Sequence, residues 1–261
     1  MSRVTLGQFI PGDSLVHSLD PRAKVVCVIA AAMSVLAASN WQGFALSAAF
    51  TLIAIIVSKL PGRIFLGVLR SMWVLLAITF IIQILLTPGE VLAGLGPLKI
   101  SREGLQAGVQ LFIRLALLIL LASLLTLTTS PMNLTAGLES MLSPLGRLGA
   151  PVHELAMMMT IALRFVPTLF QEAEVVIKAQ RSRGAVIATG SPAGWAKGML
   201  PLFVPLFSGA IRRAEELAVA MEARCYRGGT NRTRMRELRF GFIDYAAVAA
   251  TLLVLAGVLA F

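Results

Sequence analysis

Five long apolar stretches constrain this chain more than any other feature of its sequence. They cover residues 23–40, 41–58, 68–87, 105–129 and 243–261. A helix needs about 20 mostly apolar residues to cross the hydrocarbon core of a bilayer. Over the whole chain 57% of the residues are hydrophobic and only 14% are charged, which is far too apolar for a water-soluble domain. The sequence therefore predicts an all-α integral membrane protein with about five transmembrane helices.

The positive charges predict how these helices are oriented in the membrane. The chain has a net charge of +10, and 14 of its 23 lysines and arginines lie between residues 131 and 242. By contrast, only Lys99 and Arg102 lie between the third and fourth apolar stretches. Because lysine and arginine favour the cytoplasmic side, we expect a multi-pass protein of a prokaryotic cell membrane, with its N-terminus inside and its C-terminus outside. A basic chain can also bind nucleic acid, but no basic stretch here is interleaved with aromatic residues, so no nucleic-acid partner is expected.

This topology divides the chain into three parts. We expect a membrane domain with four transmembrane helices at 1–130, a cytoplasmic domain at 131–242 and a last transmembrane helix at 243–261. The middle part contains apolar residues at steps of three or four from Leu155 to Leu169 and again from Met199 to Met221. That spacing predicts two long amphipathic helices without an uninterrupted span.

Prolines mark further boundaries within the cytoplasmic part. Ser130 followed by Pro131 is typical of a helix start, and it predicts a short helix at about 131–142. Pro167, Pro201 and Pro205 lie inside the two long patterns, where proline removes a backbone hydrogen bond, so we expect kinks or interruptions there.

Both long helices end in a compact signal of arginine and glycine. The first ends in Gln180-Arg181-Ser182-Arg183-Gly184, and the second in Glu222-Ala223-Arg224-Cys225-Tyr226-Arg227-Gly228-Gly229. Glycine just after a helix and arginine in its last turn are ordinary C-terminal caps, which is the simplest interpretation of each end alone. Two such ends in one cytoplasmic segment favour a second interpretation, in which they present arginines to partners.

Several stretches together are similar to one family, the T components of energy-coupling factor (ECF) transporters, and the likeness covers essentially the whole chain. They are Gly7-Gln8-Phe9-Ile10-Pro11-Gly12-Asp13-Ser14, Leu19-Asp20-Pro21-Arg22-Ala23-Lys24, Leu127-Thr128-Thr129-Ser130-Pro131, Ala162-Leu163-Arg164-Phe165-Val166-Pro167-Thr168-Leu169 and the end of the second long helix. The resemblance implies a scaffold that joins two ABC-type ATPase subunits to a membrane-embedded, substrate-binding S component for vitamin uptake.

The resemblance also implies which residues couple the chain to the ATPases. The family carries two Ala-Arg-Gly motifs at the ends of its coupling helices, and each arginine docks into a groove on one ATPase. Here the motifs are Ser182-Arg183-Gly184 and Ala223-Arg224-Cys225, with Arg181 and Arg227 as possible supporting residues. Both keep the arginine, while Cys225 replaces a glycine and tolerates a positive φ less well.

Other classes of function fit the sequence less well. There is no Gly-x-x-x-x-Gly-Lys-Ser/Thr phosphate-binding loop, so we expect no ATPase activity in this chain itself. His17 and His153 have no second ligand at helical spacing, and we expect neither a cofactor nor a metal. Arg114, inside an apolar stretch, is interpreted as a structural residue, with an ion site as the alternative. A T component dedicated to cobalt, nickel or biotin and a membrane adaptor without ATPase partners stay open as alternatives.

Overall fold

The computed structural model describes residues 9–88, 90–95, 98–146, 149, 151–184, 192–228 and 238–260. The chain divides into two compact units. Unit 1 comprises residues 1–141 and 237–261, and unit 2 comprises residues 142–236.

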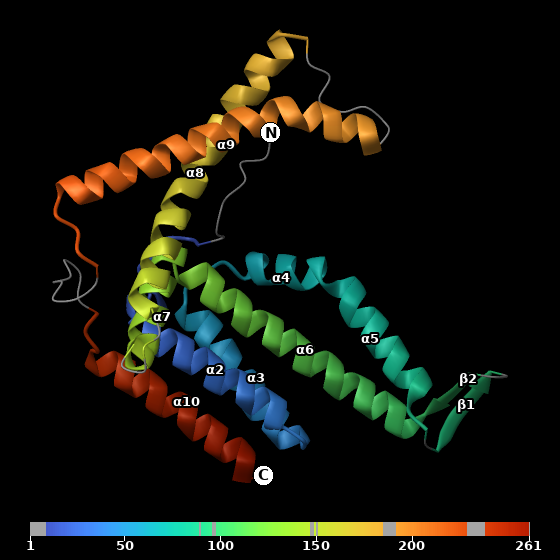
Figure 1. Cartoon of the computed structure of the whole chain (residues 1–261). Helices are drawn as coiled ribbons and strands as arrows, with labels where there is room; N and C mark the ends of the chain where they lie inside the picture. Colours follow the sequence, from blue (N-terminus) through green and yellow to red (C-terminus); the bar gives the residue numbers. More distant parts are fainter. Residues whose placement is uncertain are drawn as a thin grey trace. The chain divides into compact units, whose positions relative to one another are not determined.

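Unit 1 is a helical assembly with one small hairpin (Figure 1). Its elements are α1 (Leu15–Ser18), α2 (Pro21–Ala37), α3 (Trp41–Val57), α4 (Gly62–Ser71), α5 (Trp73–Leu86), β1 (Val91–Leu95), β2 (Leu98–Ser101), α6 (Arg102–Thr128), the first residues of α7 (Pro131–Gly146) and α10 (Phe242–Ala260). Helix α2 lies at the centre, because it packs against α10, α3 and α6. Helix α6 in turn contacts α4 and α5. The contact of α2 with α10 brings the N-terminal and C-terminal parts of the chain together in one unit.

Length and composition identify the helices that can cross a membrane. Within the described residues α6, α8 and α10 meet both requirements, and α4 with α5 makes a fourth if the bent pair is one span. Helices α2 and α3 each have 17 residues, the lower end of the range for a span. The predicted all-α membrane protein is confirmed, whereas the predicted number of five spans is not. Helix α8 lies in the segment 131–242, which was expected to contain no uninterrupted span, and it is apolar enough over 18 residues to be a candidate. The cytoplasmic placement of 131–242 stays a prediction.

The third predicted span, residues 68–87, is divided between two helices. Helices α4 and α5 meet at a bend of 55° around Met72, which ends one helix and begins the other. The N–H of Met72 donates to the carbonyls of Val68 and Leu69, while its own carbonyl accepts from Leu76. Helix α5 alone is about 21 Å long at 1.5 Å per residue, shorter than the hydrocarbon core.

A hairpin that the sequence analysis did not predict joins α5 to α6. Strands β1 and β2 pair antiparallel with an irregularity between Val91 and Ala93. The hairpin is fixed to α6 by two bonds at its base, from the N–H of Glu90 to the Glu103 carboxylate at 2.8 Å and from the N–H of Arg102 to the Glu90 carbonyl at 3.0 Å.

The core of unit 1 combines large apolar residues with small polar ones. Val35 and Leu127 are almost completely buried, and so are Ser34, Ser47 and Thr51. The small hydroxyl groups bond within or between helices, for example Thr51 Oγ1 to the Ser47 carbonyl at 2.8 Å. Small residues allow helix backbones to approach closely, which is the packing expected where lipid rather than water surrounds the helices.

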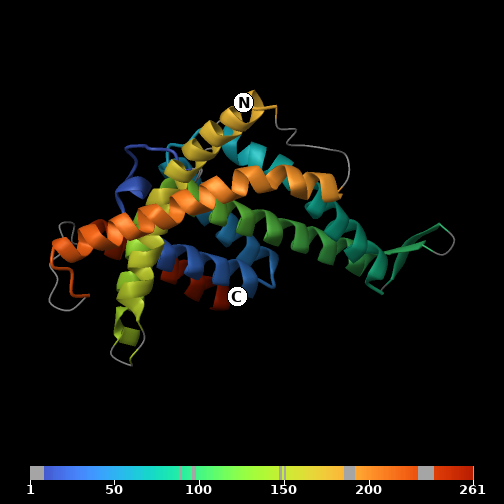
Figure 2. The ribbon, with the colours of Figure 1, turned by 45° about the horizontal axis from the view of Figure 1, so that its top comes forward.

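Unit 2 is dominated by two long helices, α8 (Val152–Ser182) and α9 (Pro192–Ala223), which cross each other (Figures 1 and 2). Helix α9 has 32 residues and is about 48 Å long. Helices α8 and α9 continue through Pro167, Pro201 and Pro205, so the prolines do not interrupt them. The alternative, that the prolines kink the helices, stays a prediction. The short helix predicted at 131–142 is confirmed as α7, which extends to Gly146; the N–H of Asn133 donates to Ser130 Oγ at its start.

Candidate functional site

The first arginine end is the C-terminus of α8. Arg183 is the C-cap residue, and its N–H donates to the carbonyls of Ala179 and Gln180 at 3.2 Å. Gly184 follows with a φ of +81°, a left-handed conformation that glycine adopts without steric cost. Its N–H donates to the Arg181 carbonyl at 3.0 Å. The backbone therefore turns away directly after Arg183 and leaves its side chain at the tip of the helix.

The second arginine end has the same local geometry at the C-terminus of α9. Arg224 follows the last helical residue, and Cys225 has a φ of +56°. The N–H of Cys225 donates to the Glu222 carbonyl at 2.9 Å, and that of Tyr226 to the Met221 carbonyl at 3.0 Å. These two bonds form the Schellman motif that often ends helices. Cys225 thus adopts the left-handed conformation that glycine favours after a helix.

Both ends are accessible and carry free charge. Ser182, Arg183 and Gly184 are exposed, and so are Ala223, Arg224 and Cys225. The supporting residues Arg181 and Arg227 are exposed as well. In the described parts of the chain, none of these four guanidinium groups has an ion-pair or hydrogen-bond partner. A permanently charged, planar donor at an exposed helix end is suited to binding carboxylates on another protein.

Each arginine end is braced by a contact with the other long helix. Gln180, three residues before Arg183, donates from Nε2 to the Pro201 carbonyl of α9 at 3.3 Å. In a regular helix the N–H of residue 205 would donate to the Pro201 carbonyl, but proline has no N–H. Gln180 therefore supplies the hydrogen bond that this carbonyl lacks within α9. At the other end the hydroxyl of Tyr226 donates to Met157 Sδ of α8 at 3.0 Å.

The crossing itself contains apolar residues and one ion pair. An apolar groove of about 410 Å³ runs between the helices, lined by Val166, Leu169, Phe170, Ala173, Phe203, Leu206, Phe207 and Ala210. Arg213 Nη2 lies 2.9 Å from Glu172 Oε2, and Gly209 leaves room for the Glu172 carboxylate, which would lie 2.9 Å from an added Cβ. Arg183 and Arg224 each follow their member of this ion pair by eleven residues, about 16 Å of helix.

A buried ionic cluster in unit 1 was missed by the sequence analysis. Asp244 is 5% exposed; its Oδ1 accepts from the N–H of Asp20 at 2.7 Å and its Oδ2 from the N–H of Gly241 at 2.7 Å. Lys24, also 5% exposed, donates from Nζ to the carbonyls of His17 and Thr128 at 3.0 Å. The signal was present in the sequence, because Asp244 is a carboxylate inside the span predicted at 243–261 and Lys24 a cation inside that at 23–40.

The remaining candidate residues have structural surroundings. Arg114 donates from Nη2 to the Ala38 carbonyl at 2.7 Å and lies over the Phe44 ring, so its expected contact with protein is confirmed. His17 Nδ1 lies 2.6 Å from Ser14 Oγ, and its Nε2 lies 3.1 Å from the Ile10 carbonyl. Within the described residues no three histidine, cysteine or acidic side chains gather as a metal site requires. Gly7, Gln8 and Gly229 of the quoted motifs lie outside the described residues.

Comparisons with known proteins agree along the length of the chain. Residues 12–235 match the family described as "Cobalt transport protein". The "Energy-coupling factor transporter transmembrane protein EcfT" of Thermosediminibacter oceani is 46% identical over 257 residues, which are 98% of this chain and 97% of that protein. The proteins of the same name from Acidaminococcus fermentans, 45% identical over 100% of this chain and 97% of the relative, and Listeria innocua, 46% identical over 99% and 98%, are equally similar.

Proposed function

Because this chain belongs to the family of the energy-coupling factor transporter transmembrane protein EcfT, we propose that it couples two ATPase subunits to a substrate-binding S component. The chain is a membrane subunit of a transporter, and the ATP hydrolysis belongs to its partners in this proposal. One observation carries the coupling role. Two long helices of one compact unit end in the same way, each with an exposed arginine followed by a residue of positive φ.

Arg183 and Arg224 are the proposed contacts with the ATPases. A guanidinium binds a carboxylate with two parallel hydrogen bonds, which fixes the direction of the contact as well as its strength. The short caps end each helix directly beside its exposed arginine, so the guanidinium is accessible to a partner groove. Arg181 and Arg227, which are exposed nearby, add positive charge that attracts acidic partner surfaces.

Motion at the tips is passed on through the crossing of α8 and α9. When ATP binding brings the two ATPases together, each docked arginine moves with its own subunit. A helix of this length behaves as a stiff rod, and packed side chains slide or tilt rather than compress. A displacement of either tip therefore changes the angle at the crossing, where the apolar groove and the Glu172–Arg213 pair lie. The surface that holds the S component shifts as a consequence.

The orientation in the membrane forms part of the same proposal. ABC-type ATPases use cytoplasmic ATP, so both arginine ends must lie in the cytoplasm. The excess of lysine and arginine between residues 131 and 242 supports that side. It also supports a cytoplasmic N-terminus and an outer C-terminus.

The test replaces the two arginines in the full chain, co-expressed with its ATPase and S components. We expect Arg183→Ala or Arg224→Ala to weaken binding of the ATPases by about 30-fold, since truncating one member of a desolvated charge pair costs about 2 kcal/mol. The double variant loses both contacts and stops substrate uptake. Affinity is measured by pull-down against a dilution series, and uptake in reconstituted vesicles.

Matched controls remove charge from the same helices away from their ends. Arg164 on α8 and Arg212 on α9 are exposed arginines without a partner in the described residues. Arg164→Ala together with Arg212→Ala leaves both affinity and uptake within twofold of the unmodified protein. Full uptake by the Arg183/Arg224 double variant overturns the proposal.

A dedicated metal transporter is the second candidate, favoured by the description "Cobalt transport protein" of the matching family. In that case the chain serves a single S component. Copurification distinguishes the two, because a shared T component is recovered with several different S components and a dedicated one with a single S component.

A further inference from the structure

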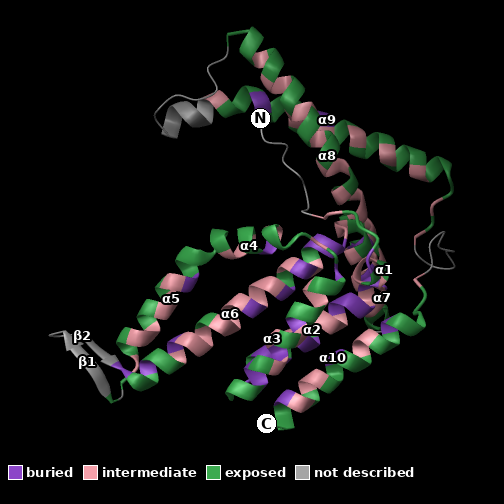
Figure 3. Ribbon diagram, turned by 180° about the vertical axis from the view of Figure 1, so that it is seen from behind, coloured by how far each residue is buried: buried purple, intermediate pink, exposed green. Residues whose placement is uncertain are grey.

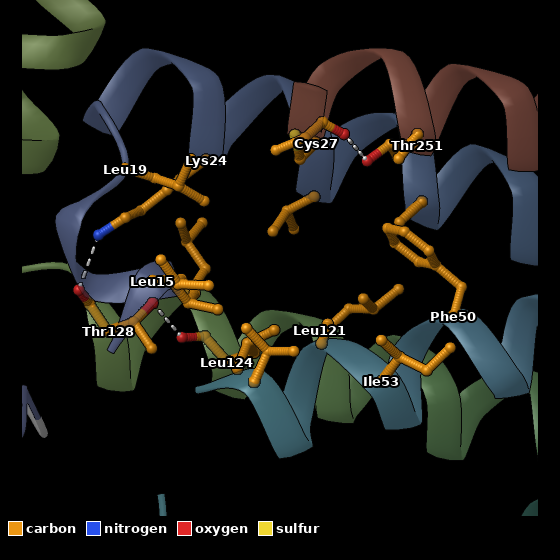
Figure 4. A pocket seen from close by; sticks show the side chains of 18 of the residues that line it. Leu15, Leu19, Lys24, Cys27, Phe50, Ile53, Leu121, Leu124, Thr128 and Thr251 are labelled. Atoms are coloured by element: carbon orange, nitrogen blue, oxygen red, sulfur yellow. Dashed lines mark hydrogen bonds between the residues drawn. The ribbon is translucent and has the colours of Figure 1, made fainter. Parts of the chain in front are cut away.

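Unit 1 contains an apolar cavity between several of its helices (Figure 4). Its volume is about 330 Å³, and its walls come from α1, α2, α3, α6 and α10. Leu15 of α1 lies at one end of it, and Phe50 and Ile53 of α3 lie toward the other. All five elements belong to unit 1, so the cavity is a feature of one compact body.

The cavity results from small side chains on α10. This helix contributes Ala246, Ala247 and Ala250 to the wall, while the opposite walls contribute leucine, isoleucine and phenylalanine. The alanines leave a gap between α10 and its neighbours although α2 and α10 pack closely. Leu15, Ile53 and Ala250 in its wall are exposed, so the cavity opens to the surface of unit 1.

Water is a poor occupant of this cavity. The polar groups in its wall are already bonded within the chain: Lys24 Nζ to two carbonyls, Thr128 Oγ1 to the Leu124 carbonyl at 2.7 Å and Thr251 Oγ1 to the Ala247 carbonyl at 2.8 Å. A buried water needs two to four polar partners, and a cavity lined by leucine and phenylalanine stays dry and takes up apolar molecules.

The surroundings of unit 1 select among the apolar occupants. Because α6 and α10 are long and apolar enough to span a bilayer, lipid surrounds unit 1 and supplies acyl chains at high concentration.

Positive charges lie at the same ends of the helices that line the cavity. The exposed Lys59 is two residues after Val57 of α3, which also lines the cavity. Arg22, two residues before Lys24 in α2, is already engaged, because its Nε lies 3.9 Å from Asp20 Oδ1. The charge of Lys59 is opposite to that of a lipid phosphate. We propose that one acyl chain of a membrane phospholipid occupies this cavity, with its phosphate near Lys59. The proposal requires a membrane location but does not depend on the coupling role of the arginine ends.

Photocrosslinking in vesicles tests the proposal. The probe is phosphatidylglycerol with a diazirine in one acyl chain, and labelled peptides of the full chain are identified by mass spectrometry. We expect label on the α2 and α10 residues that line the cavity. Ala250→Phe fills the space and reduces that label at least fivefold. The matched control is Ala249→Phe, which enlarges an exposed neighbour that does not line the cavity.

Further measurements separate loss of the site from loss of the fold. Ala247→Leu fills less of the cavity and is used if Ala250→Phe is not monodisperse by gel filtration. Added phosphatidylglycerol raises the melting temperature of the unmodified protein in detergent, because a ligand that binds the folded state stabilises it. This rise is lost in the filled variant and kept in the control. Equal label in the filled variant and the control, or label spread evenly over all exposed helix faces, overturns the proposal.

Discussion

The two units of the chain are stabilised in different ways. Unit 1 has three clusters of buried apolar side chains and a buried ionic cluster around Asp20, Lys24 and Asp244. In the described residues of unit 2, the buried side chains are only Ala156 and Leu202 (Figure 3). Its long helices are instead held by one crossing and by contacts near their ends. Unit 1 is therefore stabilised by burial, whereas the described part of unit 2 depends on a few contacts between its helices.

The largest effect is expected where unit 1 buries charge. Asp244→Asn places an amide NH₂ opposite the N–H of Asp20 or of Gly241, where a carboxylate oxygen accepts in the unmodified protein. It also removes a negative charge that interacts with Lys24. We expect the free energy of unfolding to fall by about 3–5 kcal/mol, the usual cost of breaking a buried ionic cluster. Unfolding in mixed detergent micelles measures it.

The matched variant makes the same chemical change in unit 2. Glu174 is exposed on α8 and has no partner in the described residues, so Glu174→Gln changes the free energy of unfolding by less than about 0.5 kcal/mol. Equal effects of the two substitutions would contradict the contrast between the units.

Leucine truncation tests the same contrast without charge. Leu127 is 2% exposed in the core of unit 1, whereas Leu200 of α9 is 64% exposed. Leu127→Ala lowers the free energy of unfolding by about 3 kcal/mol, since it removes buried methyl groups and leaves a cavity. Leu200→Ala has an effect below about 0.5 kcal/mol. A larger effect at Leu200 would mean that α9 is stabilised by burial after all.

The sequence was sufficient for the two long helices of unit 2 and for the places where they end. Apolar periodicity predicted α8 and α9, and the glycine and arginine signals predicted their last residues, because both depend on neighbours within one or two turns. It was insufficient wherever a distant residue decides the outcome. Helix α9 continues through Pro205, which has no N–H to donate to the Pro201 carbonyl. The side chain of Gln180, 25 residues before Pro205 in the sequence, donates to this carbonyl instead.

The same explanation holds for the features that were missed in unit 1. Met72 lies in an unbroken apolar run, so hydropathy alone gave no reason to end a helix there. Asp244 lies at the start of a predicted span. Its carboxylate oxygens accept hydrogen bonds from the N–H groups of Asp20 and Gly241, and the bond to Asp20 joins residues 224 positions apart. Contacts across such separations cannot be inferred from one sequence.

A moderate effect is expected at the ends of the unit 2 helices. A residue other than glycine at a left-handed position costs about 1 kcal/mol, and Cys225 has a φ of +56°. Cys225→Gly therefore slows hydrogen exchange of the Tyr226 amide about fivefold, because this amide bonds the Met221 carbonyl in the cap.

Gly184→Ala makes the opposite change at the other end. Its φ of +81° places the added Cβ in a strained conformation although the space around it is open. Hydrogen exchange of the amide at position 184, which donates to the Arg181 carbonyl, becomes about fivefold faster. Unchanged exchange in both variants would mean that the caps do not limit the order of the arginine ends.

The smallest effect on stability is expected at the crossing of unit 2, where the Glu172–Arg213 pair is partly exposed. The side chains are 23% and 31% exposed, so solvent screens the pair and Glu172→Gln lowers the free energy of unfolding by less than about 1 kcal/mol.

A change at this pair has a larger effect on uptake than on stability if the crossing passes motion between the arginine ends. We expect Glu172→Arg to reduce uptake in reconstituted vesicles, since two arginines then meet beside Gly209, and the double variant Glu172→Arg with Arg213→Glu to restore it. Rescue with little change in stability in all three variants separates a role in geometry from a role in folding. Normal uptake by Glu172→Arg alone would remove this pair from the coupling path and leave the apolar groove as the contact that sets the crossing angle.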